Sequence, residues 1–304
     1  MRRLSRPNSV FSTVGRNHHA WRNNLRTYPL TEEKRQRWLD EGRGTGEGPH
    51  YKPWLTYYDF ASRGDMHRLL EGRYRRLCHL FSDVERRVFL YLDASRQVVD
   101  IREQYPLDLA ITRDIARRLG IQHPRDRHSG VDITMTTDFL VEVRWRGKTR
   151  LIALSCKLDA DLGDFNIAEH AEIERLYWLQ RGVAWYLVTD GVHCVPDAVF
   201  DNLQLIYPRR FLDAESPPGP LSFQERTEVL IRAIRRCSTP KSLYTLSTEL
   251  AANYGLENDK WLHQAYHLIY RHELSADLHC RDLSQHDVAE IARMSFAAAA
   301  QEAA

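Results

Sequence analysis

An aspartate and a lysine stand near the two ends of the segment Thr137 to Leu158, which reads TDFLVEVRWRGKTRLIALSCKL. Apolar and polar residues alternate along both halves of this segment, which predicts a β-hairpin. A two-residue type II′ turn at Gly147-Lys148 would set Asp138 opposite Lys157. Residues that face each other across a ladder share one face of the sheet. We therefore expect the carboxylate and the ammonium side by side, and we expect the other, more apolar face to be the buried one.

This pair suits the metal-dependent hydrolysis of a phosphodiester. Mg²⁺ prefers oxygen ligands, lowers the pKa of a bound water and neutralises phosphate charge, while an ammonium group can orient that water. An Asp followed by x-x-Lys on the next strand resembles the nuclease core of the restriction-endonuclease superfamily, but the usual acid two residues before the lysine is Ser155 here. The metal shell would then need the Ser155 hydroxyl, the main-chain carbonyl of Cys156, or water. On this pattern alone, an ordinary hairpin with a surface aspartate and lysine is the other interpretation.

A second acid, Glu85, lies near the start of a predicted helix in the segment FSDVERRVFLYLD. Ser82 and Glu85 have the spacing of a capping box, in which the glutamate bonds back to the cap amide. Glu85 also shares the inward stripe of the helix, where a carboxylate is costly unless it is paired or binds a cation. Both interpretations, cap and metal ligand, stay open. The neighbouring Arg86 and Arg87 could contact phosphate or could be solvated helix-face charges.

Glu142 and Glu174 are further candidate acids. Glu142 is predicted on the Asp138 face of the hairpin, and Glu174 is placed for a helix ion pair. The order of elements around these residues is α-β-β-β-α-β, with one inserted helix, which predicts a mixed sheet covered by helices. The predicted elements are a helix after Ser82, a strand over 98–105, an inserted helix over 107–119, the hairpin, a helix over 167–181 and a strand over 183–190.

Composition limits the class of protein. The chain has 304 residues, which is long enough for two domains. Its formal charge of +2 by itself predicts no partner. No run of about 18 apolar residues is present, and no apolar targeting segment follows the amino terminus. The five cysteines are scattered without a metal-binding spacing, so we expect reduced thiols in a cytoplasmic, bacterial protein.

The first 50 residues form a predicted basic arm. Residues 1–31 include six arginines and no acid. Such an arm could follow a phosphate backbone or could be an unstructured tail. A nuclease domain is expected over 51–212, followed by a proline-rich linker over 213–220.

Several segments in the same order resemble the TnsA family, the endonuclease subunits of heteromeric cut-and-paste transposases. The similar segments are YKPWLTYYDF (51–60), HLFSDVERR (79–87), VVDIREQYPL (98–107), LGIQHP (119–124), MTTDFLV (135–141), Cys156-Lys157 and IERLYWLQRGVAWYLVTD (173–190). They cover roughly residues 50 to 195. The resemblance implies a restriction-endonuclease-like fold in which Glu85, Asp138 and Lys157 are catalytic.

The resemblance also implies an activity and partners. The expected reaction is Mg²⁺-dependent cleavage, with Mn²⁺ as a substitute, of the strand at the 5′ ends of transposon DNA. Glu85, Asp138, the Cys156 carbonyl and Ser155 are the expected metal ligands. The implied partners are a TnsB-like transposase and a TnsC-like ATP-dependent regulator. Two alternatives stay open: a stand-alone restriction or repair endonuclease, and a non-catalytic assembly subunit.

Residues 221–304 form a second predicted domain. Three helices are expected over 222–237, 241–254 and 258–271, then a short hairpin over 272–284 and a last helix from Ser284. This order resembles a winged helix-turn-helix, as in the carboxy-terminal domain of TnsA. The third helix would be the recognition helix. Such a module could dock to a protein partner as well as to DNA, and the fold alone does not decide between them.

Overall fold

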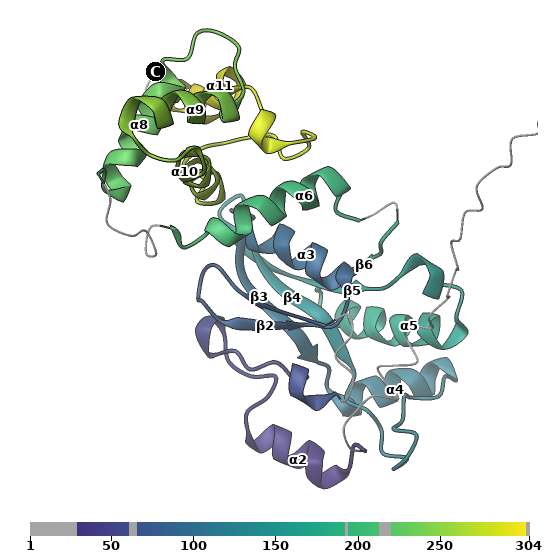
Figure 1. Ribbon diagram of the computed structural model, residues 1–304. Helices are drawn as coiled ribbons and strands as arrows, with labels where there is room; N and C mark the ends of the chain where they lie inside the picture. The colour runs from purple at the N-terminus through teal and green to yellow at the C-terminus, as the bar shows by residue number, and fades with distance from the viewer. Residues whose placement is uncertain (1–28, 61–65, 192–193, 213–219, 302–304) are drawn as a thin grey trace, which may run out of the picture.

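A four-stranded mixed sheet is the centre of the first domain. The computed structural model describes residues 29–60, 66–191, 194–212 and 220–301 (Figure 1). The strands lie in the order β3-β4-β5-β6, with bounds β3 Val98–Pro106, β4 Thr136–Trp145, β5 Lys148–Cys156 and β6 Ala184–Val188. The first three strands are antiparallel and β6 is parallel to β5. Since a parallel neighbour needs a crossover connection, helix α5 (Phe165–Leu179) links the last two strands. The predicted α-β-β-β-α-β order is confirmed.

Helices cover both faces of this sheet. Helices α3 (Asp83–Asp93) and α6 (Asp197–Ile206) pack on one face, and α4 (Leu109–Leu119) and α5 pack on the other (Figure 1). Phe139 belongs to the first core and the adjacent Leu140 to the second. The expectation of a single buried hairpin face was therefore wrong, because the inserted helix α4 and the crossover helix α5 cover the face that includes Asp138.

The hairpin turns one residue earlier than predicted. Arg146 and Gly147 occupy the two turn positions with φ of 49° and 74°, and Trp145 pairs with Lys148. Two positive φ values define a type I′ turn, whose twist matches the twist of the strands. The ladder register is consequently shifted by two residues from the predicted one. Because side chains alternate with a period of two, this shift leaves Asp138 and Lys157 on the same face.

Segments before α3 pack around the sheet. They are α2 (Glu32–Asp40), the 3-10 turns η1 (Gly48–His50) and η2 (Tyr57–Asp59), and the hairpin β1 (His67–Leu70) with β2 (Leu77–Leu80). Trp38 of α2 is buried and contacts Trp54 edge to face at 5.3 Å. Residues 29–50 therefore pack as part of the first domain, although the arm was expected to extend to residue 50. The β1-β2 hairpin was not predicted, and residues 1–28 lie outside the described residues.

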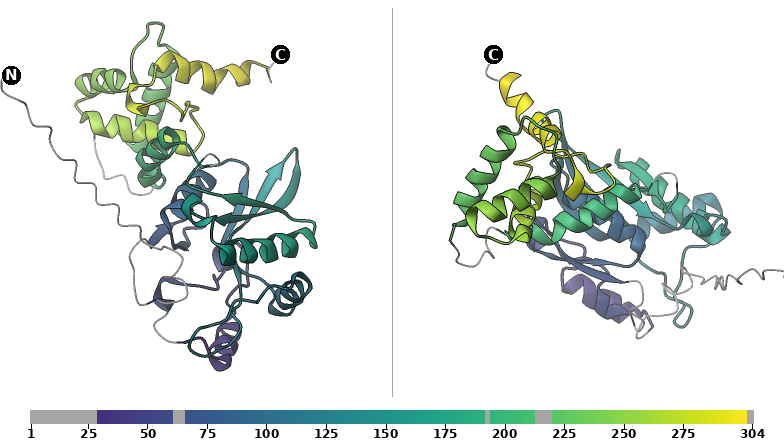
Figure 2. Two further views of the ribbon diagram at one scale, coloured as in Figure 1. Left: turned by 90° about the vertical axis from the view of Figure 1, so that its right-hand side faces the viewer. Right: turned by 45° about the horizontal axis from the view of Figure 1, so that its top comes forward.

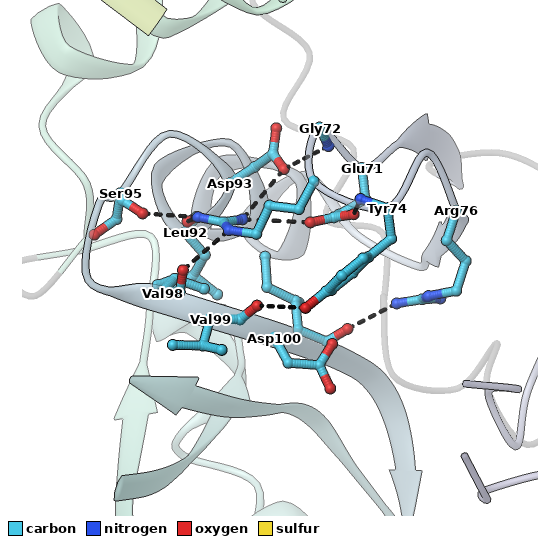
Figure 3. Close-up of polar contacts among 12 residues, drawn as sticks. Glu71, Gly72, Tyr74, Arg76, Leu92, Asp93, Ser95, Val98, Val99 and Asp100 are labelled. Carbon is cyan, nitrogen blue, oxygen red and sulfur yellow. Dashed lines mark hydrogen bonds and ion pairs between the residues drawn. The ribbon is translucent and has the colours of Figure 1, made fainter. Parts of the chain in front are cut away.

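The outer edge of β3 is covered by side chains. The Arg73 guanidinium donates to the Val98 carbonyl at 3.0 Å and to the Ser95 carbonyl, at the end of α3, at 2.7 Å. Arg76 donates to the Ile101 carbonyl at 2.7 Å, and the Tyr74 hydroxyl to the Val99 carbonyl at 3.3 Å. Figure 3 shows Glu71, Gly72, Tyr74 and Arg76 of the β1-β2 turn gathered against the corner of α3 and β3. The hairpin thus satisfies carbonyls that an open edge strand would expose.

The second domain consists of α8 (Phe223–Arg235), α9 (Leu243–Tyr254), α10 (Asn258–Tyr270), η5 (Leu283–Gln285) and α11 (Val288–Gln301). The three expected helices and the last one are confirmed. The expected hairpin over 272–284 is wrong: within the described chain this segment contains turns and η5 but no ladder. The Asn202 amide of α6 donates to the carbonyls of Leu278 and Cys280, so these polar groups bond to the first domain and not to a neighbouring strand.

The helix expected to read DNA is the most enclosed helix of the second domain. Nine of the 13 residues of α10 are buried, including Trp261 and His267. The His267 ring bonds the Arg209 carbonyl at 2.7 Å, and the Tyr270 hydroxyl donates to the Asp93 carboxylate at 2.6 Å. The assignment of α10 as a recognition helix was therefore wrong, because α10 packs against the first domain.

Two further observations concern the whole chain. All five cysteines are free thiols. No helix in the described residues has the length and apolar character that a membrane crossing requires.

Candidate active site

Asp138 and Lys157 meet at one end of the central hairpin. Asp138 is 1% exposed, and its Oδ2 lies 3.2 Å from the Lys157 Nζ. The same oxygen accepts the main-chain N–H of Cys156 at 2.7 Å. The main chain of Lys157 is fixed in turn, because its N–H donates to the Val188 carbonyl of β6 at 2.9 Å. The predicted pairing of acid and ammonium is present, although the register that produces it differs.

Three oxygens surround the lysine ammonium. Besides Asp138 Oδ2, the Nζ lies 3.0 Å from the Ser155 Oγ and 3.0 Å from the Cys156 carbonyl. Ser155 is fully buried, so its hydroxyl is a fixed member of this set. A carboxylate, a hydroxyl and a carbonyl that already converge on one cationic group form a hard, oxygen-only donor set. That is the chemistry that Mg²⁺ selects.

The remaining metal ligands would have to come from elsewhere. Among the described residues, no three His, Cys, Asp or Glu side chains are grouped so that they could hold a metal ion. Mg²⁺ sites in phosphoryl-transfer proteins commonly use one or two carboxylates with waters and substrate phosphates. The donor set around Asp138 fits such an ion, and Ser155 and the Cys156 carbonyl stand where the sequence lacks a second acid.

Glu85 is fully buried at the first turn of α3. Its Oε2 accepts the main-chain N–H of Phe81 at 2.9 Å, and its Oε1 accepts the Ser82 hydroxyl at 3.2 Å. The Ser82 hydroxyl also caps the helix by accepting the Glu85 N–H at 3.1 Å. Ser82 therefore caps α3 as predicted, but the expected bond from Glu85 back to the Ser82 amide is replaced by a bond to the Phe81 amide.

Gln104 of β3 connects Glu85 to the hairpin, a role that was not predicted. Its side-chain Nε2 donates to Glu85 Oε2 at 3.1 Å, and its side-chain Oε1 accepts from the Thr136 hydroxyl at 3.2 Å. The pairs Glu103 to Phe139 and Tyr105 to Thr137 flank the position where Gln104 faces Asp138. Gln104 has a φ of 48° within a strand, an uncommon value for a residue other than glycine. Nothing in the local sequence pattern signals this conformation. The main-chain carbonyl of Gln104 accepts the N–H of Trp54, which belongs to a distant segment of the chain.

Glu174 of α5 is the third buried acid of this region. Its carboxylate accepts the Thr137 hydroxyl at 2.7 Å, and the Thr137 oxygen accepts the Trp178 indole N–H at 2.6 Å. Burial raises the pKa of Glu174; the nearby Lys157 opposes that rise and the Asp138 charge adds to it. In place of the predicted helix ion pair, Glu174 is buried and accepts the Thr137 hydroxyl.

A pocket of about 140 Å³ opens beside the lysine. Lys157, His170 and Glu174 contribute its charged and titratable groups, and Leu55, Phe60 and Met135 contribute much of its apolar wall. Burial lowers the pKa of His170, and the neighbouring His123 and Lys157 lower it further. The His170 imidazole and the Lys157 side chain therefore line the same pocket.

Other candidates are engaged elsewhere. Arg86 donates to the Gln204 amide oxygen at 2.6 Å, and Arg87 pairs with Asp197 at 2.5 Å; both partners belong to α6. Contacts of these arginines with phosphate are not supported, because their guanidinium groups hold α3 and α6 together. Glu142 pairs with Arg102 at 3.4 Å.

The chain is similar to known proteins along most of this region. The family model of the TnsA-like endonuclease N terminal matches residues 95–190, and that of the TnsA endonuclease C terminal matches residues 195–278. The first match includes Asp138 and Lys157 and begins after Glu85. The chain is 41% identical over 178 residues to the transposon Tn7 transposition protein TnsA of Escherichia coli, an alignment that covers 59% of this chain and 63% of that protein. Two family models in order and this identity show that the chain belongs to the TnsA-like endonuclease family.

Proposed function

We propose that this protein is the metal-dependent endonuclease subunit of a cut-and-paste transposase. It would hydrolyse the non-transferred strand at the 5′ ends of the transposon. The observation that supports the proposal most directly is the convergence of the Asp138 carboxylate, the Ser155 hydroxyl and the Cys156 carbonyl on the Lys157 ammonium within 3.0–3.2 Å. Membership of the TnsA-like family supports transposon-end DNA as the substrate.

Each residue would have a distinct role. Asp138, the Cys156 carbonyl and Ser155 would hold Mg²⁺, and Glu85 would be the second carboxylate of the site. When bound, the metal would supply charge neutralisation at the scissile phosphate and acidify a water. Lys157 would leave its oxygen partners to orient that water and to offset charge that develops on the phosphate. The Cys156 N–H keeps Asp138 Oδ2 in place while the lysine moves.

The proposed partners are a TnsB-like transposase, which would cut and join the 3′ ends, and a TnsC-like ATP-dependent regulator. A stand-alone restriction or repair endonuclease would instead cleave DNA without partners. A non-catalytic assembly subunit would bind without cleaving. Reconstitution with Mg²⁺ and a transposon-end duplex, with and without the partner subunits, separates these three functions.

The decisive variant is Asp138→Asn, which keeps the shape of the side chain and removes its charge. We expect loss of 5′-end nicking by about 10²-fold or more, as is usual when a group that stabilises transition-state charge is removed. We also expect loss of the Mg²⁺-dependent increase in thermal stability, a readout that does not need catalysis. Glu142→Gln is the matched control, since Glu142 lies on the same strand and face and pairs with Arg102 away from the site. Full nicking by Asp138→Asn would contradict the proposal.

A further inference from the structure

The tip of the β4-β5 hairpin has an unusual charge. Residues 144–150, RWRGKTR, contain four cationic side chains and no acid. Arg144, Arg146, Lys148 and Arg150 are all exposed, and Trp145 between them is 49% exposed. Among the described residues, none of the four forms an ion pair within the chain; the Arg146 guanidinium lies over the Trp145 ring at 5.9 Å. Most other arginines of this domain have carboxylate or carbonyl partners, so this tip differs from the rest of the surface.

The tip also extends beyond the sheet. On one side β3 begins at Val98, which faces Val143, and on the other side β6 begins at Ala184, which faces Ile152. Among the described residues, 145–150 therefore pair only within the β4-β5 hairpin and with neither β3 nor β6. We call residues 144–150 the basic ribbon. In the left view of Figure 2 the hairpin projects away from the helices that cover the sheet.

The register places the charges on both faces of the basic ribbon. Trp145 pairs with Lys148 and Val143 with Arg150, so Trp145, Lys148 and Arg150 share one face. Arg144 pairs with Thr149 on the other face. A narrow two-stranded element with cations on both sides can meet two rows of phosphates at once.

The shape and charge of the basic ribbon fit duplex DNA. The major groove is about 12 Å wide and admits a two-stranded β-ribbon, and its rims are two lines of phosphates. Unpaired arginine and lysine side chains at such an element neutralise phosphates and release counterions. The exposed ring of Trp145 provides an apolar surface for the sugars between them. An acidic protein surface would satisfy the charge but would not require cations on both faces of a projecting ribbon.

The distance from the candidate active site is set by strand geometry. Eight residues separate Asp138 from Arg146, which at about 3.3 Å per residue is roughly 26 Å. Since base pairs are stacked about 3.4 Å apart, a duplex that runs along the hairpin would reach the tip about eight base pairs from the scissile phosphate.

We infer that the basic ribbon is a second DNA contact, which binds the phosphates of the duplex about eight base pairs from the cleavage position. This inference rests on the proposed function in that DNA is taken as the substrate. It adds a surface that positions the duplex at a distance from the chemistry. It also predicts that the contact depends on salt and not on base sequence.

The test uses the full chain in EDTA and a duplex of about 40 base pairs with a central cleavage site. The variant R146N/K148Q/R150Q removes three charges from the basic ribbon. R146N places Asn before Gly147, the preferred pair for a type I′ turn, so the hairpin itself is favoured and misfolding is not expected. We expect DNA affinity to fall about tenfold or more, and the slope of log K against log salt to decrease by about two to three, since each neutralised phosphate contributes about 0.9.

Two controls make the result specific. The variant R232Q/R236Q/R271Q removes three exposed arginines of the second domain and should leave the affinity and the salt slope nearly unchanged. Shortening one arm of the duplex to fewer than about six base pairs should lower the DNA affinity of the wild-type protein. The same change should have little further effect on the DNA affinity of the basic ribbon variant. Shortening each arm separately shows whether the contacted arm is transposon or flanking DNA.

The outcomes separate the two proposals. An unchanged salt slope in the basic ribbon variant, or an equal loss in the second-domain control, would overturn the DNA contact while leaving the nuclease proposal intact. Unchanged DNA binding together with failed assembly on the partner subunits would assign the basic ribbon to a protein surface and would also overturn the inference. Failure of the wild-type chain with its partners to cut any DNA would count against the proposed function itself.

Discussion

Asp138 and Lys157 show how buried charge is kept ready for chemistry. A carboxylate that is 1% exposed would be costly without partners. The Lys157 ammonium and the Cys156 N–H provide those partners at 3.2 Å and 2.7 Å. The same ammonium contacts the three oxygens that we propose as metal ligands. These contacts keep the oxygens oriented in the folded protein.

Gln104 donates to Glu85, the proposed second carboxylate of the site. We predict that Gln104→Ala lowers the free energy of unfolding by about 1–3 kcal/mol, because the buried Glu85 carboxylate loses a donor at 3.1 Å. Urea unfolding measures this loss. Gln104→Gly is the informative comparison, since glycine also removes the amide but accepts a φ of 48° without strain. The glycine variant should be more stable than the alanine variant; the reverse order would show that the backbone conformation is not strained.

At the scale of elements, the β4-β5 hairpin links the two proposed functions. One end of it holds the candidate active site and the other end is the basic ribbon. The adjacent strands β3 and β6 fix the middle of the hairpin, and the helices on both faces bury it. A rigid hairpin of this kind transmits the position of the duplex at the tip to the scissile phosphate at the base.

The turn of this hairpin is not optimised for stability. Arg146 has a φ of 49°, which costs energy for a residue with a long side chain, whereas Asn tolerates this region. We predict that Arg146→Asn alone raises the free energy of unfolding by about 0.5–1 kcal/mol, a typical gain from a better turn residue. Thermal or urea unfolding measures the gain, and the same variant should bind DNA more weakly. A variant that loses stability would show that the Arg146 contact with Trp145 matters more than the turn geometry.

At the scale of the whole molecule, the two domains share one core. Residues of α3 and the sheet belong to the same buried cluster as residues of α8, α9 and α10. Polar contacts add to this packing: Tyr270 donates to Asp93, and the His267 ring bonds the Arg209 carbonyl at 2.7 Å. The domain expected to act as a separate DNA-reading module is therefore fixed to the nuclease-like domain through the helix that would have been its reader.

Gly72 lies where the domains touch. A Cβ at this position would overlap the Tyr270 hydroxyl, which is hydrogen-bonded to Asp93. We predict that Gly72→Ala displaces Tyr270 and lowers the free energy of unfolding by about 1–3 kcal/mol, as overpacking usually does. Gly163→Ala is the matched control, because its Cβ would meet nothing within 4 Å. Equal stability of the two variants in urea unfolding would show that the interface adapts without cost.

Asp93 makes the same interface sensitive to pH. Burial raises the pKa of Asp93, against the opposing effects of the hydrogen bonds from Tyr270 and Gly72 and of the charge of Arg73. A carboxyl with a higher pKa in the folded state binds its proton more tightly when folded. Its contribution to stability is present below the unfolded pKa of about 3.9 and is lost as the pH rises through the folded value. We predict that Asp93→Asn gains stability relative to the wild type between pH 4 and pH 7. Unfolding in urea at both pH values measures the difference, and a constant difference would contradict the prediction.

The sequence by itself determined the order of the elements and the sharing of one face by Asp138 and Lys157. Both follow from local periodicity, because alternation along a strand survives a register shift of two residues. It also determined the Ser82 cap of α3, which depends on residues three apart. The resemblance to TnsA identified the family, to which the matches over residues 95–190 and 195–278 also assign the chain.

Only the tertiary structure decided the remaining features. These include the burial of both sheet faces, the positive φ of Gln104 and the position of Glu174. They also include the side chains that bond the outer edge of β3 and the burial of α10. Each depends on contacts between residues far apart in the chain, such as Trp54 with Gln104 or Asp93 with Tyr270. A local pattern records which residues prefer a helix or a strand, but the partner that satisfies a buried polar group is chosen when distant segments pack together.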